Sequence, residues 1–356
     1  MIKVSFLLLY IFFFFISPGQ PLNTEDLTLI SQAIKNKKII GLGEPEHFYK
    51  GYYELKIQII KHLVTTNEIN AIAFEGSSIE CKKLDAYING ADADLYAILP
   101  NLNAGYNYEK SGIFDCKEIV DFLQWLRREN KNRKEKISIY GIDFQNIESP
   151  VKNLKAHFPN SNSFHKGLDS LKNNLYSLMK QLSDDVSNGE LPKIFFDETW
   201  KLKATNNYKL SERIQGYVKK EKDKWINQNA KELNQFSYIF TDPNLERDKM
   251  MFDNFVWQFN PAKTTLIWAA DFHIANDSIV NKTNTIRKLG TYLNKKYGDQ
   301  YFKIALIESE NPQPSKRILY PVPAENKISG IYDLLIFCHG GNRAIRLVDQ
   351  ANDEEK

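Results

Sequence analysis

The apolar stretch Lys38–Gly43 passes directly into Glu44, Glu46 and His47. This change from apolar to ionisable side chains determines the expected fold and the expected place of a site. Short apolar runs rich in β-branched residues are typical of parallel strands that are covered on both faces. Five similar runs follow, at Ala71–Glu75, Ile137–Asp143, Thr264–Ala270, Phe302–Glu308 and Leu334–Cys338. We therefore predict one central, largely parallel sheet.

Helical patterns separate the predicted strands. Apolar residues recur every three or four positions within residues 53–64 and again within residues 119–126. Strands that alternate with helices indicate an α/β fold in which helices cover a parallel sheet. We predict that residues 21–348 form a single α/β domain of this kind.

A long segment in the second half of the chain, about residues 151–260, lacks strand patterns. Its leucines step by three and four residues, which is the spacing of a buried helix stripe; they are Leu168, Leu171, Leu175, Leu178 and Leu182. We predict that this segment is a helical insertion covering the sheet. The last residues, 349–356, are predicted to be a polar tail.

The N-terminus has the pattern of a secretory signal peptide. Lys3 precedes the apolar run Val4–Ile16, and the helix-breaking residues Pro18 and Gly19 follow it. The run is shorter than the ~20 residues of a membrane-spanning helix. We predict that residues 1–20 are a signal peptide and that the protein is exported, to the periplasm or the medium, without stable membrane insertion after its removal. A buried N-terminal element and a retained anchor are the alternatives.

The composition excludes several classes of function. Lys plus Arg number 47 and Asp plus Glu 44, so the net charge of +3 gives no reason to expect nucleic acid as a partner. The three cysteines, Cys81, Cys116 and Cys338, are too widely spaced for a zinc ribbon or a disulfide framework. The first strand ends in glycines, but Glu46 replaces the third glycine of a dinucleotide fingerprint. We predict no cofactor, with a divalent metal left open.

Ionisable residues follow most of the predicted strands. In a parallel sheet, ligands bind beyond the carboxyl ends of the strands, so these side chains are expected to meet at one rim. A single carboxylate after a strand is often only a helix cap or a turn former. The residues concerned are Glu44, Glu46, His47, Glu75, Asp143, Asp271, His273 and Glu308.

The rim residues suggest acid–base chemistry. Histidine is the natural base near neutral pH, and a carboxylate against its ring fixes the tautomer and stabilises the protonated form. Glu44 and His47, three residues apart, could activate a water in this way, and His273 could stabilise an oxyanion or protonate a leaving group. Two histidines with carboxylates also match hydrolytic zinc sites. The residues alone leave both readings open.

The motifs around these residues resemble the erythromycin esterase family, in order, from about residue 39 to residue 308. The resemblance rests on a strand end with G-E-x-x-H, an aromatic-Glu-Leu-Lys helix, G-x-D-x-Q, R-D-x-x-M-x-x-N and a strand end with W-A and a later His. The matching segments are 43–47, 53–56, 141–145, 247–254 and 268–273.

The resemblance implies metal-independent hydrolysis of an ester or lactone in a small molecule. It implies that His47 is the general base, that Glu44 supports it, and that Glu75 and His273 line the same pocket as further catalytic residues. We further predict five residues of the rim and its motifs as substrate-binding: Glu46, Lys56, Asp143, Arg247 and Asp271. Arg247 could instead pair with its neighbour Asp248.

The chain also departs from the family pattern. Ala270 replaces a histidine, Asp271 an asparagine, and Phe48 the glycine that commonly follows the base. Two alternatives to an esterase remain at this stage. One is a metal-dependent hydrolase or peptidase that uses the same rim, and the other is a non-catalytic binding protein for a small molecule or haem.

Overall fold

The computed structural model describes residues 21–103, 112–189, 193, 196–241, 246–280, 285–309, 318–323, 326 and 328–344. The predicted signal peptide and the predicted polar tail lie outside these residues. Within them, no helix is long and apolar enough to span a bilayer.

A seven-stranded sheet forms the centre of the fold, and each of the six predicted apolar runs is one of its strands. The order across the sheet is β3-β2-β4-β1-β7-β9-β8. The predicted strands all pair in parallel, and only the short β8 is antiparallel to its neighbour β9. The bounds are β1 (Ile39–Glu44), β2 (Ala71–Ser77), β3 (Ser138–Asp143), β4 (Thr265–Ala270), β7 (Tyr301–Glu308), β8 (Ile318–Leu319) and β9 (Leu334–Cys338).

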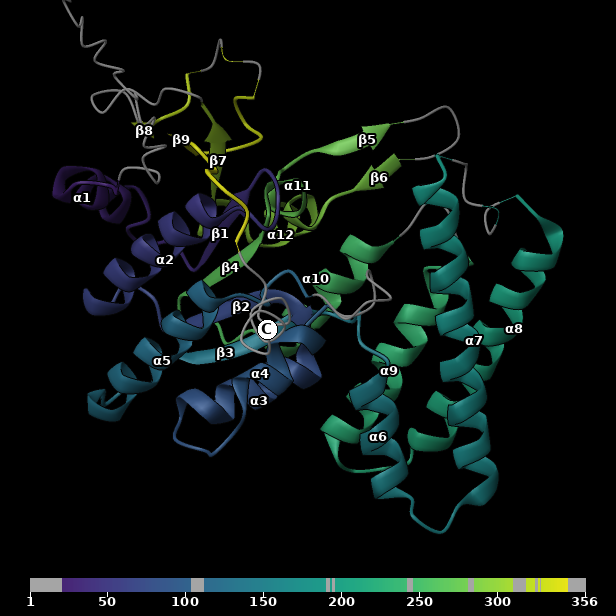
Figure 1. Cartoon of the computed structure of the whole chain (residues 1–356). Helices are drawn as coiled ribbons and strands as arrows, with labels where there is room; N and C mark the ends of the chain where they lie inside the picture. Colours follow the sequence, from purple (N-terminus) through teal and green to yellow (C-terminus); the bar gives the residue numbers. More distant parts are fainter. Residues whose placement is uncertain are drawn as a thin grey trace, which may run out of the picture.

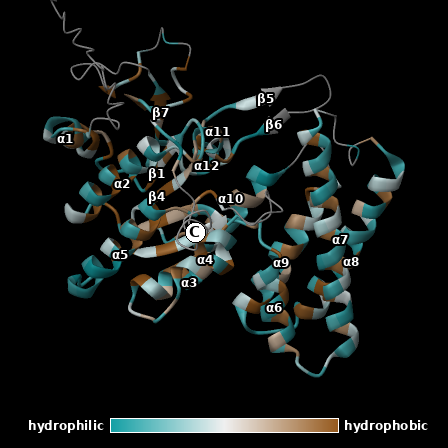
Figure 2. Ribbon diagram, viewed as in Figure 1, coloured by the Kyte–Doolittle hydropathy of each residue, from teal (hydrophilic) through white to brown (hydrophobic). Residues whose placement is uncertain are grey.

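Helices cover both faces of this sheet, because alternate strand residues point to opposite sides. Ile40 and Leu42 of β1 pack into one core with α1 (Thr24–Ala33), α2 (Lys50–Thr65), α3 (Ser78–Ile88) and α5 (Lys117–Asn132). Ile39 belongs to the second core, which includes residues of α10 (Arg247–Gln258) and α12 (Leu289–Tyr297). The long helices carry both hydrophobic and hydrophilic residues, as helices with one buried face do (Figure 2). The predicted α/β fold with a largely parallel sheet is therefore confirmed.

The described residues between β3 and β4 are organised as helices. They are α6 (Glu148–His157), α7 (Asn162–Ser187), α8 (Glu198–Val218), α9 (Lys224–Tyr238) and α10. Four of them, α6 to α9, lie together to one side of the sheet (Figure 1). The leucine stripe of α7 is buried from Leu168 to Leu178, as its spacing predicts.

The remaining elements are short. A two-stranded antiparallel ribbon consists of β5 (Ser278–Val280) and β6 (Thr285–Arg287). The short helices are α4 (Leu95–Ile98), η1 (Leu99–Asn101), α11 (Asp271–Ile274) and η3 (Gly298–Gln300).

The carboxyl ends of β1 and β4 lie side by side, with Glu44 paired to Ala270. The helix α11 follows β4 directly and crosses over β1 at Gly43. A Cβ atom at Gly43 would lie only 2.5 Å from the Cα of Asp271, which is closer than real Cβ contacts come. The glycine therefore allows α11 to carry His273 onto the rim where Glu44 ends its strand.

Candidate functional site

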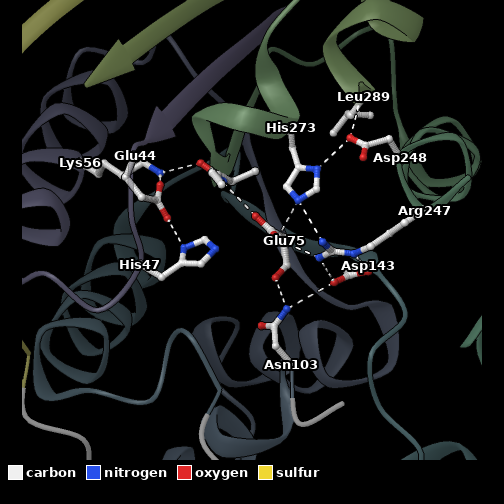
Figure 3. Close-up of polar contacts among 12 residues, drawn as sticks. Glu44, His47, Lys56, Glu75, Asn103, Asp143, Arg247, Asp248, His273 and Leu289 are labelled. Atoms are coloured by element: carbon white, nitrogen blue, oxygen red, sulfur yellow. Dashed lines mark hydrogen bonds and ion pairs between the residues drawn. The ribbon is translucent and has the colours of Figure 1, made fainter. Parts of the chain in front are cut away.

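The first half of the site is a pair formed by Glu44 and His47. Glu44 ends β1 and is fully buried, and its Oε1 lies 2.9 Å from the Nδ1 of His47 (Figure 3). Its other oxygen contacts Nζ of Lys56, which extends from α2 and donates to the carbonyl oxygen of Ala269 at 3.0 Å. Burial holds the pKa of this lysine well below its ordinary value. The carboxylate accepts a hydrogen from Nδ1, so the Nε2 of His47 is the nitrogen left to take up a proton.

His47 has the protonation state of a base at neutral pH. Burial lowers the pKa of His47 below its ordinary value of 6.5; the charges of His273 and Arg247 lower it further, while Glu75 and Asp271 act against them. The ring remains accessible to solvent, because the His47 side chain is 25% exposed. A neutral imidazole that is partly exposed beside buried charged groups can accept a proton from water.

The second half of the site is centred on Glu75, a buried residue of β2. Its Oε2 accepts the backbone N–H of Ala270 at 2.9 Å. Its Oε1 lies 2.9 Å from Nη2 of Arg247 and 3.3 Å from Nε2 of His273. Burial would raise the pKa of Glu75, but the charges of His273, Arg247 and His47 hold it well below its ordinary value. The carboxylate therefore stays ionised.

His273 is held between two carboxylates. Its Nδ1 lies 2.8 Å from Oδ1 of Asp248, which also accepts the backbone N–H of Leu289 at 2.7 Å. Burial lowers the pKa of His273, but the Asp248 and Glu75 carboxylates outweigh it and raise the pKa to about 10. In the protonated ring Nε2–H donates toward Oε1 of Glu75 at 3.3 Å, whereas Nη1 of Arg247, 3.0 Å from Nε2, can donate to that nitrogen only when the ring is neutral. The ring is therefore an imidazolium near neutral pH, suited to donate a proton or to stabilise negative charge.

Arg247 joins the ends of β2 and β3. Its Nη2 lies 2.7 Å from Oδ2 of Asp143 and also contacts Glu75. The pairing with Asp248 that the sequence suggested is not the arrangement seen, since Asp248 bonds to His273 instead. Asn103 donates to the carbonyl oxygen of Glu75 at 2.6 Å and supports this end of β2 from below (Figure 3).

The structure therefore places the predicted residues in three ways. Two adjoining groups form the rim: the first comprises Glu44, His47 and Lys56, and the second comprises Glu75, Asp143, Arg247 and His273. Asp271 lies beside them at the start of α11, where burial raises its pKa. Glu46 does not join the buried network. Its side chain is 61% exposed, and its nearest cation is Arg343 at 3.8 Å.

Two polar residues of the site were not predicted as such from the sequence. The sequence indicates Asp248 only as a partner for Arg247, whereas its carboxylate fixes the second histidine. Asn103 belongs to none of the predicted motifs. The signal for Asp248 was its place in the first turn of a helix that follows Glu246, where carboxylates are common for reasons unrelated to function. Nothing in the sequence around Asn103 marks it.

A metal centre has no preformed ligand set in the part of the chain that the structure describes. Among those residues, no group of three or more His, Cys, Asp or Glu side chains is arranged to hold a metal ion. The carboxylates of the rim bond instead to Lys56, Arg247 and the two histidines.

Sequence comparison finds distant relatives that are named as hydrolases. Over 136 residues the chain is 24% identical to erythromycin esterase type I of Escherichia coli, a match that covers 38% of this chain and 31% of that enzyme. The chain thus aligns with about a third of that relative's length. It is 21% identical over 360 residues to YbfO of Bacillus subtilis (strain 168), which carries a hydrolase name; this match covers 86% of the chain and 75% of YbfO.

Solved structures share the fold at low identity. A protein from Bacillus cereus superimposes with a TM-score of 0.58 at 19% identity, over 90% of this chain and 93% of its own. An erythromycin esterase mutant in its open conformation gives a TM-score of 0.54 at 16% identity, over 94% of this chain and 84% of that chain.

A family model defines the relationship. The model of the erythromycin esterase family matches residues 64–310, which contain Glu75, Asp143, Arg247 and His273, whereas Glu44 and His47 precede the matched segment. Because the match takes in more than half of the chain, this protein belongs to the erythromycin esterase family.

Proposed function

We propose that the protein is a hydrolase that cleaves an ester, a lactone or a related acyl bond of a small molecule with water activated by His47. The observation that carries the proposal is the pairing of a neutral histidine with a buried carboxylate, beside a second histidine that is held protonated. The family and its named relatives support a hydrolase in general. The bond and the mechanism are our proposal.

The chemistry assigns a role to each side chain. The Nε2 of His47 takes one proton from water while the water oxygen attacks the acyl carbon. Glu44, which accepts from Nδ1 at 2.9 Å, stabilises the imidazolium that forms. The bond to the leaving oxygen then breaks, and His47 returns the proton to that oxygen, so the products are a carboxylic acid and an alcohol.

The developing negative charge is assigned to the second half of the site. His273 is already cationic, and Arg247 lies within 3.0 Å of its Nε2. Positive charge that is already oriented toward the developing oxyanion is among the largest contributions to acyl transfer catalysis. Asp248 serves as the residue that holds the His273 ring in place through Nδ1.

The substrate differs, on this proposal, from erythromycin, the compound for which the related esterases are named. Ala270 stands where the family pattern has histidine, and Asp271 where it has asparagine. Both residues adjoin the rim at the end of β4. The altered size and charge at this strand end favour a different small ester. We further propose, from the pattern of residues 1–20, that the protein acts outside the cytoplasm.

The test is hydrolysis by the purified protein of a panel of aryl esters and a macrolide lactone, with and without a strong chelator. The test variant is His47→Ala and the control is His62→Ala. His62 lies in the last turn of α2, away from the rim, where its Nε2 bonds to the hydroxyl of Ser31. Turnover that survives the chelator and His62→Ala but is lost in His47→Ala supports the proposal. Turnover lost with the chelator would favour the metal-dependent alternative, and turnover that survives in His47→Ala would refute the role of His47.

A further inference from the structure

We infer that the segment His339–Ala344, here called the strap, holds the loop of residues 45–49 in the conformation that places His47 against Glu44. Tyr52 and Glu308 are the positioning residues that bind the strap to α2 and to the sheet. The catalytic consequence rests on the function proposed above, whereas the mechanical coupling does not. The strap lies outside residues 64–310, the segment that defines the family match.

The strap caps the first turn of α2. The first N–H groups of an α-helix have no partner within the helix, and the N-cap residue Tyr49 offers no side-chain hydrogen bond to them. The strap supplies the missing acceptors. The N–H of Lys50 donates to the carbonyl oxygen of Asn342 at 3.0 Å, and the N–H of Gly51 donates to that of Gly340 at 2.8 Å.

The strap also holds the residue next to the proposed base. Phe48 has a φ of 70°, in the left-handed region that bulky residues avoid. Its carbonyl oxygen accepts the N–H of Ala344 at 2.7 Å, and its own N–H donates to the hydroxyl of Tyr53 at 2.9 Å. Strained backbone persists only where its surroundings determine it. The strap is therefore part of what keeps His47 facing Glu44.

Glu308 fastens the strap to α2 and to the sheet. Its carboxylate ends β7, contacts the hydroxyl of Tyr52, and accepts the backbone N–H of Gly340 at 3.0 Å. It also lies 2.5 Å from Nδ1 of His339. Although burial acts to raise it, the pKa of Glu308 is lowered by the hydrogen bonds from Tyr52, His339 and Gly340. One ionised carboxylate thus joins the strand end, the helix and the strap.

The packing between strap and helix leaves no room for larger residues. A Cβ atom at Gly51 would lie 2.5 Å from the carbonyl oxygen of His339, and one at Gly340 would lie 2.8 Å from the ring of Tyr52. Two glycines at one contact allow the two backbones to approach within hydrogen-bonding distance. The contact is therefore a specific interface and not a loose crossing of segments.

The experiment compares Tyr52→Phe with Tyr49→Phe in the full chain. Both tyrosines lie at the start of α2, but only the hydroxyl of Tyr52 reaches Glu308, and the Tyr49 hydroxyl makes no hydrogen bond in the described part of the chain. Hydrogen exchange is followed at the amides that join the two segments, those of Lys50, Gly51 and Ala344. We expect Tyr52→Phe to speed exchange at all three by about tenfold, because a hydrogen bond to a charged group is lost, and Tyr49→Phe to leave them unchanged.

Two outcomes would contradict the coupling between the strap and α2. One is faster exchange at Ala344 alone, with Lys50 and Gly51 still protected, and the other is an equal effect of the two substitutions. Glu308→Gln and Glu308→Ala give a second comparison that does not depend on Tyr52. Gln keeps an acceptor oxygen and is expected to protect these amides better than Ala; equal exchange in the two variants would contradict the role of Glu308.

Activity on the ester panel tests the catalytic consequence separately. Tyr52→Phe is expected to lower kcat by about tenfold, since small misplacements of a catalytic group are costly, with KM unchanged. An altered KM with an unchanged kcat would show that the strap serves binding and not positioning of His47. If the unmodified protein turns over no ester, the proposed function fails while the exchange data still decide the coupling.

Discussion

The carboxylate of Glu44 lies 2.9 Å from Nδ1 of His47 at a position that solvent does not reach, whereas the imidazole itself is partly exposed. The buried partner is further fixed by Lys56, which bonds to the neighbouring strand β4. His47, Glu44 and Lys56 thus come from a loop, a strand end and a helix, and the sheet fixes the position of the Glu44–His47 pair.

Replacing the carboxylate of Glu44 with an amide should show how much of its effect on His47 comes from its negative charge. Glu44→Gln retains the shape but not the charge that stabilises the imidazolium, so we expect kcat for ester hydrolysis to fall by about 100-fold. The control is Glu54→Gln on α2, whose partly exposed carboxylate pairs only loosely with Lys50 at 3.6 Å. Steady-state kinetics on the same ester decides the matter. Equal losses in the two variants would mean that Glu44 does not support the base.

The acid limb of the pH profile should report His47. The ring must be neutral to accept a proton, and burial lowers its pKa below 6.5. Activity is therefore expected to persist below that pH and to fall only as the solution becomes more acidic than the lowered pKa. The dependence of log kcat/KM on pH measures this directly. An acid limb centred above 6.5 would contradict the neutral state assigned to His47.

His273 should make the protein less stable as the pH rises. Its pKa is about 10 in the folded protein, against an ordinary value of 6.5, so its contribution to the free energy of unfolding is complete below about 6.5 and is lost as the pH rises through about 10. Asp248→Asn removes one of the two carboxylates that raise the pKa and should flatten this decline. Urea unfolding across that pH range is the measurement.

The control for Asp248→Asn is Asp253→Asn on the same helix. Asp253 is exposed and pairs with Lys249 at the surface, so its replacement should leave the slope of stability against pH unchanged. Identical slopes in the two variants would show that Asp248 does not hold the proton on His273.

Arg247 should be essential for stability as well as for the site. Its removal in Arg247→Met would leave the carboxylates of Glu75 and Asp143 without the cation at 2.9 and 2.7 Å. Breaking a buried ion pair typically costs about 3–5 kcal/mol in the free energy of unfolding. The exposed Arg128 on α5 is the control, and Arg128→Met should change stability by less than about 1 kcal/mol. Chemical denaturation of both variants tests the difference.

The sheet and the place of the site were predictable because both depend on local signals. Apolar runs such as Ile137–Asp143, with three isoleucines, are long enough to identify strands. The parallel arrangement then brings the polar residues at the strand ends to one edge of the sheet. Hence Glu75, Asp143 and His273, far apart in the chain, are found together as expected.

The partners within the site were not predictable in the same way. Whether Asp248 bonds to Arg247 or to His273 depends on how α10 is rotated against the sheet, and this is set by packing that no short motif encodes. Glu44 and Glu46 are the same residue type two positions apart, and only the three-residue spacing to His47 favours Glu44 as its partner. Only the end of β1 and the turn after it bury the first and expose the second.

The left-handed backbone of Phe48 should be detectable in the stability of variants at this position, independently of catalysis. At an ordinary position, glycine is less stable than alanine, because the unfolded chain gains conformational freedom. At a φ of 70° the order should reverse, since a left-handed conformation costs a residue with a Cβ atom about 1–2 kcal/mol. Phe48→Gly is therefore expected to be more stable to denaturant than Phe48→Ala, by about 1 kcal/mol. The two variants lose the same aromatic contacts, so their difference reports the backbone alone. If Phe48→Ala proved the more stable of the two, the loop that carries His47 would not have the left-handed turn on which its contact with the strap depends.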